Sequence, residues 1–226
     1  NGGCAEATPA FNVNRLCGSG LQAIVSASQA IALGDCDIAI GGGAENMSRA
    51  PYASLASRWG IRMGDAKMID MMVGALHDPF HNIHMGVTAE NVAAKYGITR
   101  EMQDALAVES HNRAQRATTE GRFQNQIVPV MLKSKKGEVA WATDEHFRPD
   151  CKPEDMAKLK PVFVKENGTV TAGNASGIND AAAAVVLMEA SAAKARGAKP
   201  MARLVGYAHT GLDPKIMGVG PISATQ

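Results

Sequence analysis

A cysteine that stands between a short apolar segment and a helix-forming run constrains the fold of this sequence most strongly. The alternating apolar positions of residues 10–13, bounded by Pro9, predict a strand. From Leu21 onward, apolar residues recur at helical spacing, and Gly34 is typical of the residue that follows a helix C-terminus. Cys17 is therefore expected at a strand-to-helix turn, at the N-terminus of the helix.

This expected position suits a nucleophile. Unpaired backbone N–H groups and the positive end of the helix dipole favour a thiolate over a thiol. Gly18 and Gly20 leave the backbone beside the sulfur bare, so a substrate can approach closely and an N–H group can point at it. Free cysteines are also often buried and unreactive, and residue type alone leaves both interpretations of Cys17 open.

Composition and charge exclude several classes of protein. A chain of 226 residues is long enough to bury a core in one or two domains. Its formal net charge of +1 gives no reason to expect nucleic acid or a membrane surface as a partner. No apolar run approaches the length of a membrane-spanning helix. The four cysteines are widely spaced without a metal-binding pattern, which fits a reduced, cytoplasmic setting.

The segment after the first helix predicts a parallel sheet. Residues 36–40 form a short apolar strand that leads into three glycines at 41–43. Strand, helix and strand would make a βαβ unit with a right-handed crossover. A glycine run after a strand can bind a phosphate, but the basic residue and helix start of such a loop are missing here. Close backbone packing beside the Cys17 turn is the favoured interpretation of residues 41–43.

From about residue 47 to residue 178 the alternation of strands and helices breaks down. Two helices are predicted in this region, one over residues 88–96 with Thr88 as its cap and Gly97 after its end. The other begins after the cap Thr99 and runs to Gly121. An insertion of this length inside an α/β domain is usually functional.

The remainder of the chain returns to strands and helices. The continuous apolar run at residues 181–188 predicts a central strand that is buried on both faces. A short helix over residues 191–196 is expected to end at Gly197, and residues 201–207 predict another strand. Three histidines, at positions 77, 81 and 84, suggest a metal site by residue type, but no pattern at helix spacing supports one.

Four segments resemble motifs of the thiolases, the acyl-CoA C-acetyltransferases. They are VNRLCGSGLQ at residues 13–22, GGGAENMS at 41–48, HMGVTAEN at 84–91 and GTVTAGNASG at 168–177. The four segments stand in the order of the family, and the resemblance covers the chain from end to end. It is strongest to the bacterial short-chain type, which includes acetoacetyl-CoA thiolases and broader β-ketothiolases.

The resemblance implies an incomplete α/β thiolase fold, a layered αβα arrangement with a mostly parallel mixed sheet and a large inserted loop domain. Residues 1–48 would belong to the N-terminal domain with the nucleophile, and residues 49–178 to the loop domain, with coenzyme A (CoA) binding and tetramer contacts. Residues 179–201 would return to the N-terminal domain, and residues 202–226 would begin the C-terminal domain. Measured against the family, both ends are expected to be cut.

The resemblance also implies an activity and its partners. Cys17 would carry an acetyl group during reversible thiolysis of acetoacetyl-CoA, or condensation of two acetyl-CoA molecules. Acetyl-CoA, acetoacetyl-CoA and CoA would be the ligands, with no permanently bound cofactor, no metal, no nucleic acid and no membrane. A homodimer or homotetramer in a bacterial cytoplasm is expected. Longer β-ketoacyl substrates such as 3-ketovaleryl-CoA remain an alternative.

The resemblance further assigns the residues that contact CoA and the acyl group. Arg148 would face the phosphates of the nucleotide end, where arginine is a favoured partner. Asp155 stands where some family members carry serine, so the hydrogen bonding there is expected to differ. The complete set of contact residues is Leu76, His84, Met85, Arg148, Val162, Phe163, Ala172, Ser176 and Met217.

Part of the family's machinery does not occur in this sequence. The segments that supply the activating histidine, the second cysteine and further oxyanion donors are absent from the 226 residues. These residues alone are therefore predicted to show no thiolase turnover. Two alternatives from other classes remain: a non-catalytic CoA-binding relative, which would tend to lose Cys17, and a cysteine hydrolase, which would need a partner histidine that no segment indicates.

Overall fold

The computed structural model describes residues 2–135 and 137–226, so position 1 of the predicted 1–48 domain lies outside the described residues, as does position 136. The chain divides into two compact units. Unit 1 consists of Asn1–Leu76 and Ile178–His209, and unit 2 of His77–Gly177 and Thr210–Gln226. The domain boundaries predicted from the sequence stay predictions.

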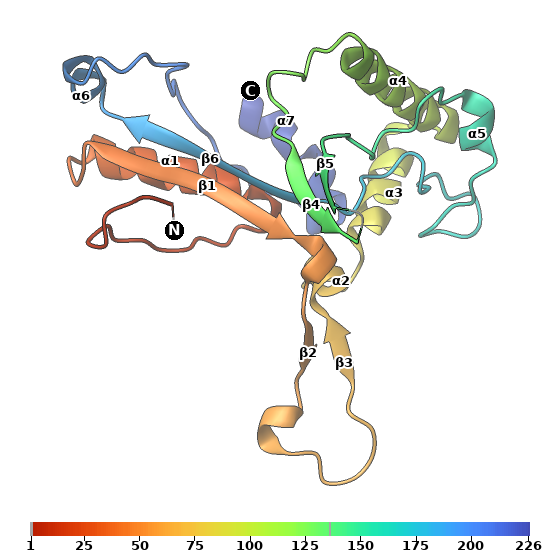
Figure 1. Ribbon diagram of the computed structural model, residues 1–226. Coiled ribbons are helices and arrows are strands. Elements are labelled where there is room, and N and C mark those ends of the chain that lie inside the picture. The colour runs from red at the N-terminus through yellow and green to blue at the C-terminus, as the bar shows by residue number, and fades with distance from the viewer. Residues whose placement is uncertain (1, 136) are drawn as a thin grey trace. The chain divides into compact units, whose positions relative to one another are not determined.

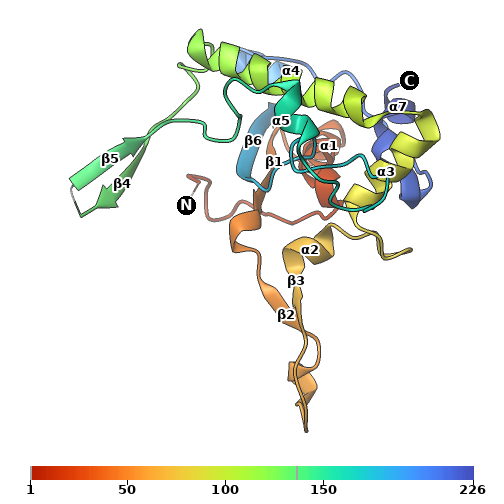
Figure 2. The ribbon, with the colours of Figure 1, turned by 90° about the vertical axis from the view of Figure 1, so that its right-hand side faces the viewer.

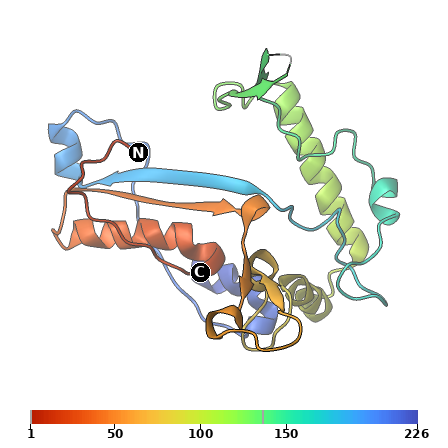
Figure 3. The same ribbon diagram turned by 60° about the horizontal axis from the view of Figure 1, so that its bottom comes forward.

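The centre of unit 1 is one helix packed on a two-stranded sheet. Helix α1 (Ser19–Ala32) lies along strands β1 (Ile38–Asn46) and β6 (Asp180–Met188), as Figure 3 shows. The strands run antiparallel, with Ile38 opposite Met188 and Asn46 opposite Asp180. Gly34 follows the helix in a left-handed conformation with φ +79°, which confirms the predicted helix end.

Glycines set the distance between α1 and the sheet. A Cβ atom at Gly41 would lie 2.9 Å from the Cα atom of Ile24, and one at Gly43 would lie 3.2 Å from the Cα atom of Gly20. Both residues of β1 therefore face the helix backbone at a separation that a side chain would increase. The predicted close backbone packing of residues 41–43 is confirmed, against the first half of α1 for Gly41 and Gly43 and against β6 for Gly42.

This close approach predicts the effect of a single methyl group. Gly41→Ala is expected to lower the free energy of unfolding by about 1–3 kcal/mol, because the helix backbone must move to accept the new Cβ atom. Chemical denaturation of the two variants measures it. Gly206→Ala is the matched control, since nothing lies within 4 Å of a Cβ atom there and its effect should stay near zero. Equal stability of the two variants would contradict the packing role.

The predicted parallel βαβ unit is wrong. Residues 10–13 are not a strand, and β1 pairs instead with the distant β6 in the antiparallel sense. A strand needs a neighbour for its backbone groups, and among the described residues none pairs with residues 10–13. The same reason applies to residues 201–207, which were predicted as a strand and have no strand structure.

Strand β6 forms where predicted, but it is not buried on both faces. Only its last two residues are partly buried, and Val186 is 66% exposed. Within unit 1 the sheet has two strands and α1 packs on one side of it, which leaves most side chains of β6 exposed. The following helix α6 (Ala190–Ala195) ends before Gly197, which has φ +63°, and this confirms its predicted end.

The rest of unit 1 is a hairpin and short helical segments. Strands β2 (Tyr52–Ser54) and β3 (Met68–Asp70) pair antiparallel and extend from the end of β1 (Figure 1). The Asp70 side chain caps helix α2 (Met71–Ala75) by accepting from the N–H groups of Met72 and Val73. The single-turn segments are η1 (Leu16–Gly18), η2 (Met47–Arg49) and η3 (Ser57–Trp59).

Unit 2 is built on two longer helices (Figure 2). The helices are α3 (Met85–Tyr96) and α4 (Arg100–Thr119), followed by the hairpin of β4 (Val130–Ser134) and β5 (Gly137–Trp141). Shorter elements are α5 (Pro153–Ala157), η4 (Pro214–Val219) and α7 (Gly220–Thr225). Met156 and Thr171 are the most deeply buried side chains of this unit.

The ends of α3 and α4 test the predicted caps. Thr99 caps α4 by accepting from the Met102 N–H at 3.3 Å, as predicted. Helix α3 ends at Gly97 as predicted, but it begins one turn earlier than expected and His84 is its cap. The prediction of Thr88 as the cap is wrong, because the Thr88 hydroxyl donates to the Met85 carbonyl within the helix, at 2.6 Å.

Among residues 2–135 and 137–226, none of the helices has both the length and the apolar character that crossing a membrane requires.

Candidate active site: the Cys17 turn and the segments around His84

Cys17 lies in η1, directly before α1, on a turn with an unusual backbone. The preceding residue, Leu16, has φ +48°, which is uncommon for a residue with a side chain. Asn14 Oδ1 accepts from the Leu16 N–H at 2.9 Å. Ser19 Oγ accepts from the Arg15 N–H at 2.8 Å and donates to the Leu16 carbonyl at 2.7 Å. Side chains on both sides of Cys17 therefore hold the strained residue in place.

The four free cysteines differ in exposure, and this separates Cys17 from a structural cysteine. Cys17 is exposed, whereas Cys151 is 7% exposed. Burial raises the pKa of the Cys151 thiol, and the charge of Asp155 adds to this effect. Cys151 thus has the properties of an inert, packed thiol, and Cys17 has the accessibility that a nucleophile needs.

His84 connects the start of α3 to an aromatic contact. Its Nδ1 atom accepts from the Gly86 N–H at 3.0 Å, so the imidazole must be neutral at that atom. Burial, together with the neighbouring His77, lowers the pKa of His84 and favours the neutral form. The ring of Phe163 stacks on His84 with centroids 4.7 Å apart, and a side chain at Gly86 would overlap that ring.

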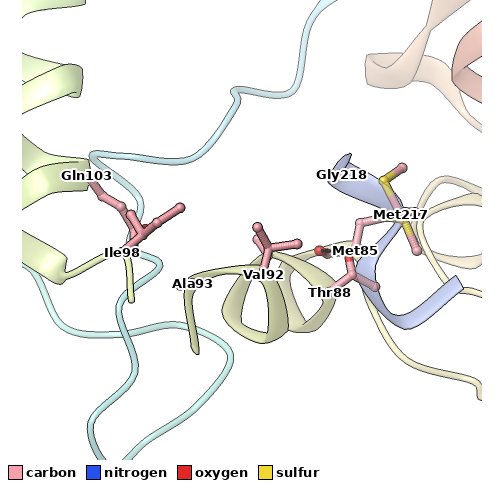
Figure 4. A pocket seen from close by; sticks show the side chains of 9 residues that line it. Met85, Thr88, Val92, Ala93, Ile98, Gln103, Met217 and Gly218 are labelled. Carbon is pink, nitrogen blue, oxygen red and sulfur yellow. Dashed lines mark hydrogen bonds between the residues drawn. The ribbon is translucent and has the colours of Figure 1, made fainter. Parts of the chain in front are cut away.

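Two of the predicted contact residues line one pocket of unit 2. Met85 from α3 and Met217 from η4 lie at the same end of a cavity of about 260 Å³ (Figure 4). Gln103 lies at the other end, and its buried Nε2 atom has no hydrogen-bond partner among the residues that the structure describes. The remaining lining residues are small or apolar apart from one threonine: Thr88, Ala89, Val92, Ala93, Ile98 and Gly218.

The segment at residues 168–177 is held to α3 by a buried carboxylate. Glu90, 9% exposed, accepts from the Thr169 N–H at 2.9 Å and from the Thr169 hydroxyl at 2.7 Å. It also accepts from the Val170 N–H at 2.8 Å. The Val170 carbonyl in turn accepts from the Val162 N–H at 3.0 Å. The segment that carries Phe163 is therefore connected to the Glu90 carboxylate through Val170.

A second polar group holds the same segment to α4. The Asn174 amide donates to Asp104 Oδ1 and to the Thr169 carbonyl, each at 2.9 Å. Asp104 is also paired with Arg100, whose guanidinium donates to the carbonyls of Met156 and Leu159. The backbone around Ala172 and Ser176 is thereby fixed, while both of these residues are exposed.

The structure brings some predicted residues together and leaves others apart. His84, Met85, Val162, Phe163 and Met217 are linked through the start of α3 and its pocket, as described above. Arg148 is exposed on a separate segment that α4 holds, also in unit 2. Cys17 and Leu76 belong to unit 1, where Leu76 is half-buried at the end of α2.

Sequence reasoning missed the residues that hold these segments. Glu90 and Asn174 stand inside two of the four motifs, and a carboxylate on the buried side of a predicted helix was the available signal. Arg100 and Asp104 are charged residues of a predicted helix, a residue type that is usually solvated. Among the described residues, no three His, Cys, Asp or Glu side chains gather in a way that could hold a metal ion.

Known proteins are similar to this chain over its whole length. The family model for the thiolase N-terminal domain matches residues 1–191. The chain is 67% identical, over its whole length, to the Beta-ketothiolase BktB of Cupriavidus necator, and it covers 57% of that protein. It is 52% identical to an Acetyl-CoA acetyltransferase of Syntrophomonas wolfei, of which it also covers 57%.

A solved structure shows the same fold. The structure of human mitochondrial 3-ketoacyl-CoA thiolase in complex with CoA superimposes with a TM-score of 0.90 at 42% identity, over 99% of this chain and 55% of that chain. The chain thus spans little more than half the length of the relatives that it matches, and over this length it has the thiolase fold. With the family model covering most of the sequence, this chain belongs to the thiolase family.

Proposed function

We propose that the protein with this chain transfers acyl groups between CoA thioesters, with Cys17 as the nucleophile that carries the acyl group. The observation that carries this proposal is the exposed Cys17 on a strained, hydrogen-bonded turn at the start of α1. Relatives named acetyl-CoA acetyltransferase and β-ketothiolase support the reaction class. Acetoacetyl-CoA, acetyl-CoA and CoA are the proposed ligands.

In the proposed thiolysis, the Cys17 thiolate attacks the 3-keto carbon of acetoacetyl-CoA. The bond between carbons 2 and 3 then breaks, its electron pair passes to carbon 2, and a proton completes acetyl-CoA as the first product. The thiolate of a second CoA attacks acetyl-Cys17, releases the cysteine sulfur and forms a second acetyl-CoA. The second step exchanges one thioester for another at nearly balanced free energy, and the two steps taken in reverse order are the condensation of two acetyl-CoA molecules.

The chain's own groups account for part of this chemistry. Backbone N–H groups at the start of α1 are suited to stabilise the oxygen that becomes negative during attack. The proton transfers at carbon 2 need an acid and a base that this proposal places outside these 226 residues. In this proposal the chain supplies Cys17, which carries the acyl group, and the residues that contact CoA.

We assign CoA to the segments of unit 2. The proposed contacts for the pantetheine arm are the ring stack of His84 and Phe163, the pocket at Met85 and Met217, Val162, and the exposed Ala172 and Ser176. Leu76, which belongs to unit 1, is proposed as a further contact from the family resemblance alone. Arg148 is the proposed partner of the nucleotide phosphates, because a guanidinium binds such groups with two parallel hydrogen bonds. The existence of a related thiolase structure with CoA supports the ligand.

A longer acyl chain is the second candidate substrate. The 67% identical relative is named a β-ketothiolase, whereas the acetyl-CoA acetyltransferases of several bacteria are 49–52% identical. Thiolysis of acetoacetyl-CoA and of 3-ketovaleryl-CoA, compared as kcat/KM, distinguishes the two candidates. A homodimer or homotetramer in the cytoplasm is part of the same proposal.

Labelling with iodoacetamide tests the role of Cys17. In the complete protein, Cys17 is expected to react faster than Cys4, Cys36 and Cys151, and a prior incubation with acetyl-CoA is expected to block it. Peptide mass spectrometry identifies the labelled residue. Exposed Cys4 is the internal control for accessibility alone. Equal rates at Cys4 and Cys17, with no protection by acetyl-CoA, would contradict the proposal.

A further inference from the structure

The segment that carries Arg148 is attached to α4 by two side chains one helical turn apart. His111 Nδ1 accepts from the Arg148 N–H at 3.2 Å. Gln115 and Asp150 make a reciprocal pair, in which the Asp150 N–H donates to Gln115 Oε1 at 2.8 Å and Gln115 Nε2 donates to Asp150 Oδ1 at 3.1 Å. Because positions four apart on a helix share one face, both attachments come from the same side of α4.

The segment around Arg148 is fixed on both sides. Asp150 has φ +54°, a conformation that costs free energy for a residue with a side chain and that the Gln115 pair holds in place. Cys151 follows it and is buried. On the other side, the ring of His146 lies against the backbone of Gly177, where a Cβ atom would overlap it. The backbone of Arg148 therefore has one defined position although its side chain is exposed.

We propose that His111 and Gln115 are positioning residues that hold Arg148 for the phosphates of the CoA nucleotide, an inference that rests on the function proposed above. An arginine side chain loses much rotamer freedom when it binds a ligand. A backbone that is already fixed reduces the total conformational entropy lost on binding. Neither residue faces the reacting carbon in this proposal. Their loss acts on the affinity for CoA and leaves the chemical step at Cys17 unchanged.

The attachment through His111 depends on pH. Nδ1 can accept a hydrogen bond only when it carries no proton. Burial lowers the pKa of His111, and the positive charges of Arg148 and His146 lower it further. The segments that pack against α4 carry three carboxylates, each with its own partner. Asp144 accepts from the His146 N–H, Asp150 accepts from Gln115 Nε2, and Asp155 forms an ion pair with Lys158.

The lowered pKa of His111 determines in which direction KM for CoA changes with pH. A histidine whose pKa is lowered in the folded state below 6.5 favours its neutral form, so the attachment is complete above that pH. As the pH falls through the lowered pKa, His111 gains a proton, loses the bond to the Arg148 N–H and places a positive charge beside Arg148. KM for CoA is therefore expected to rise as the pH falls below 6.5.

Steady-state kinetics of acetoacetyl-CoA thiolysis by the complete protein test this inference. His111→Ala is expected to raise KM for CoA about three- to tenfold, the range that loss of one hydrogen bond gives, with kcat within about twofold. His111→Asn keeps an acceptor atom near the position of Nδ1 and has no proton to gain. This variant should retain the KM of the unaltered protein and lose the rise in KM below pH 6.5.

Two further variants complete the experiment. Gln115→Glu puts a carboxylate against Asp150 and is expected to raise KM for CoA, while His81→Asn, an exposed histidine on another segment, is the control with unchanged KM. If the unaltered protein is active and His111→Asn shows the same pH dependence of KM, the positioning role is wrong and the proposed function stands. If no protein of the series cleaves acetoacetyl-CoA, the proposed function itself fails.

Discussion

Replacing Cys17 with serine is expected to lower kcat for thiolysis of acetoacetyl-CoA by about 10⁴-fold or more in the complete protein. A serine hydroxyl is a much weaker nucleophile than a thiolate, and its acyl ester does not exchange with CoA at nearly balanced free energy as a thioester does. The hydrogen bonds that hold the turn come from Asn14 and Ser19 and remain in the variant. Steady-state assays of purified proteins measure the effect.

The control for this variant is Cys36→Ser. Cys36 is a free, half-buried cysteine near the start of β1, and no role in acyl transfer is proposed for it. Its variant should keep kcat within about twofold. A Cys17→Ser variant with kcat within tenfold of the unaltered protein would exclude Cys17 as the acyl carrier.

The second large effect is expected at Glu90, on the stability of unit 2. Glu90→Ala leaves the N–H groups of Thr169 and Val170 without their acceptor, and each buried donor that loses its partner costs about 1–3 kcal/mol. A loss of about 2–5 kcal/mol in the free energy of unfolding is expected. Urea denaturation gives the free energy, and hydrogen exchange at the two amides shows whether the segment has opened.

Glu109→Ala is the matched control for Glu90. Glu109 lies on α4 in an exposed ion pair with Arg113, and exposed pairs of this kind contribute about 0–1 kcal/mol. The control variant should therefore unfold within about 0.5 kcal/mol of the unaltered protein. Equal stability of the two variants, with unchanged exchange at Thr169 and Val170, would show that Glu90 does not hold the segment.

The sequence predicts helices well in this protein because their ends are determined locally. Gly34 and Gly197 follow α1 and α6, and Thr99 caps α4, each within a few residues of the helix that it ends or begins. The start of α3 was misplaced because histidine is not among the usual capping residues. Its imidazole at position 84 acts as the acceptor there.

Strands were harder to predict because each needs a partner from elsewhere in the chain. The apolar pattern of residues 10–13 and 201–207 is compatible with a strand, yet neither has a neighbour among the described residues. Strand β1 pairs with β6 across more than 130 positions, and no local pattern specifies that pairing. The prediction that β6 is buried on both faces was wrong for a related reason, because burial depends on which other elements cover the strand.

The residues of the candidate site also differ in whether local sequence or only the fold reveals them. Cys17 and the His84 segment stand in motifs, so the sequence alone pointed to them. Glu90 reaches Thr169 over 79 positions, and His111 reaches Arg148 over 37, so only the fold brings these pairs together. What the sequence could not supply is the set of hydrogen bonds that fixes the segments proposed to bind CoA.

Mass spectrometry of the complete protein, mixed with acetoacetyl-CoA in the absence of free CoA and then quenched with acid, tests the central claim most directly. A gain in mass of one acetyl group is expected on the peptide that contains Cys17, and CoA added before the quench is expected to remove it. Turnover of acetoacetyl-CoA with Cys17 free of acetyl throughout, or with the acetyl group on another residue, would contradict it.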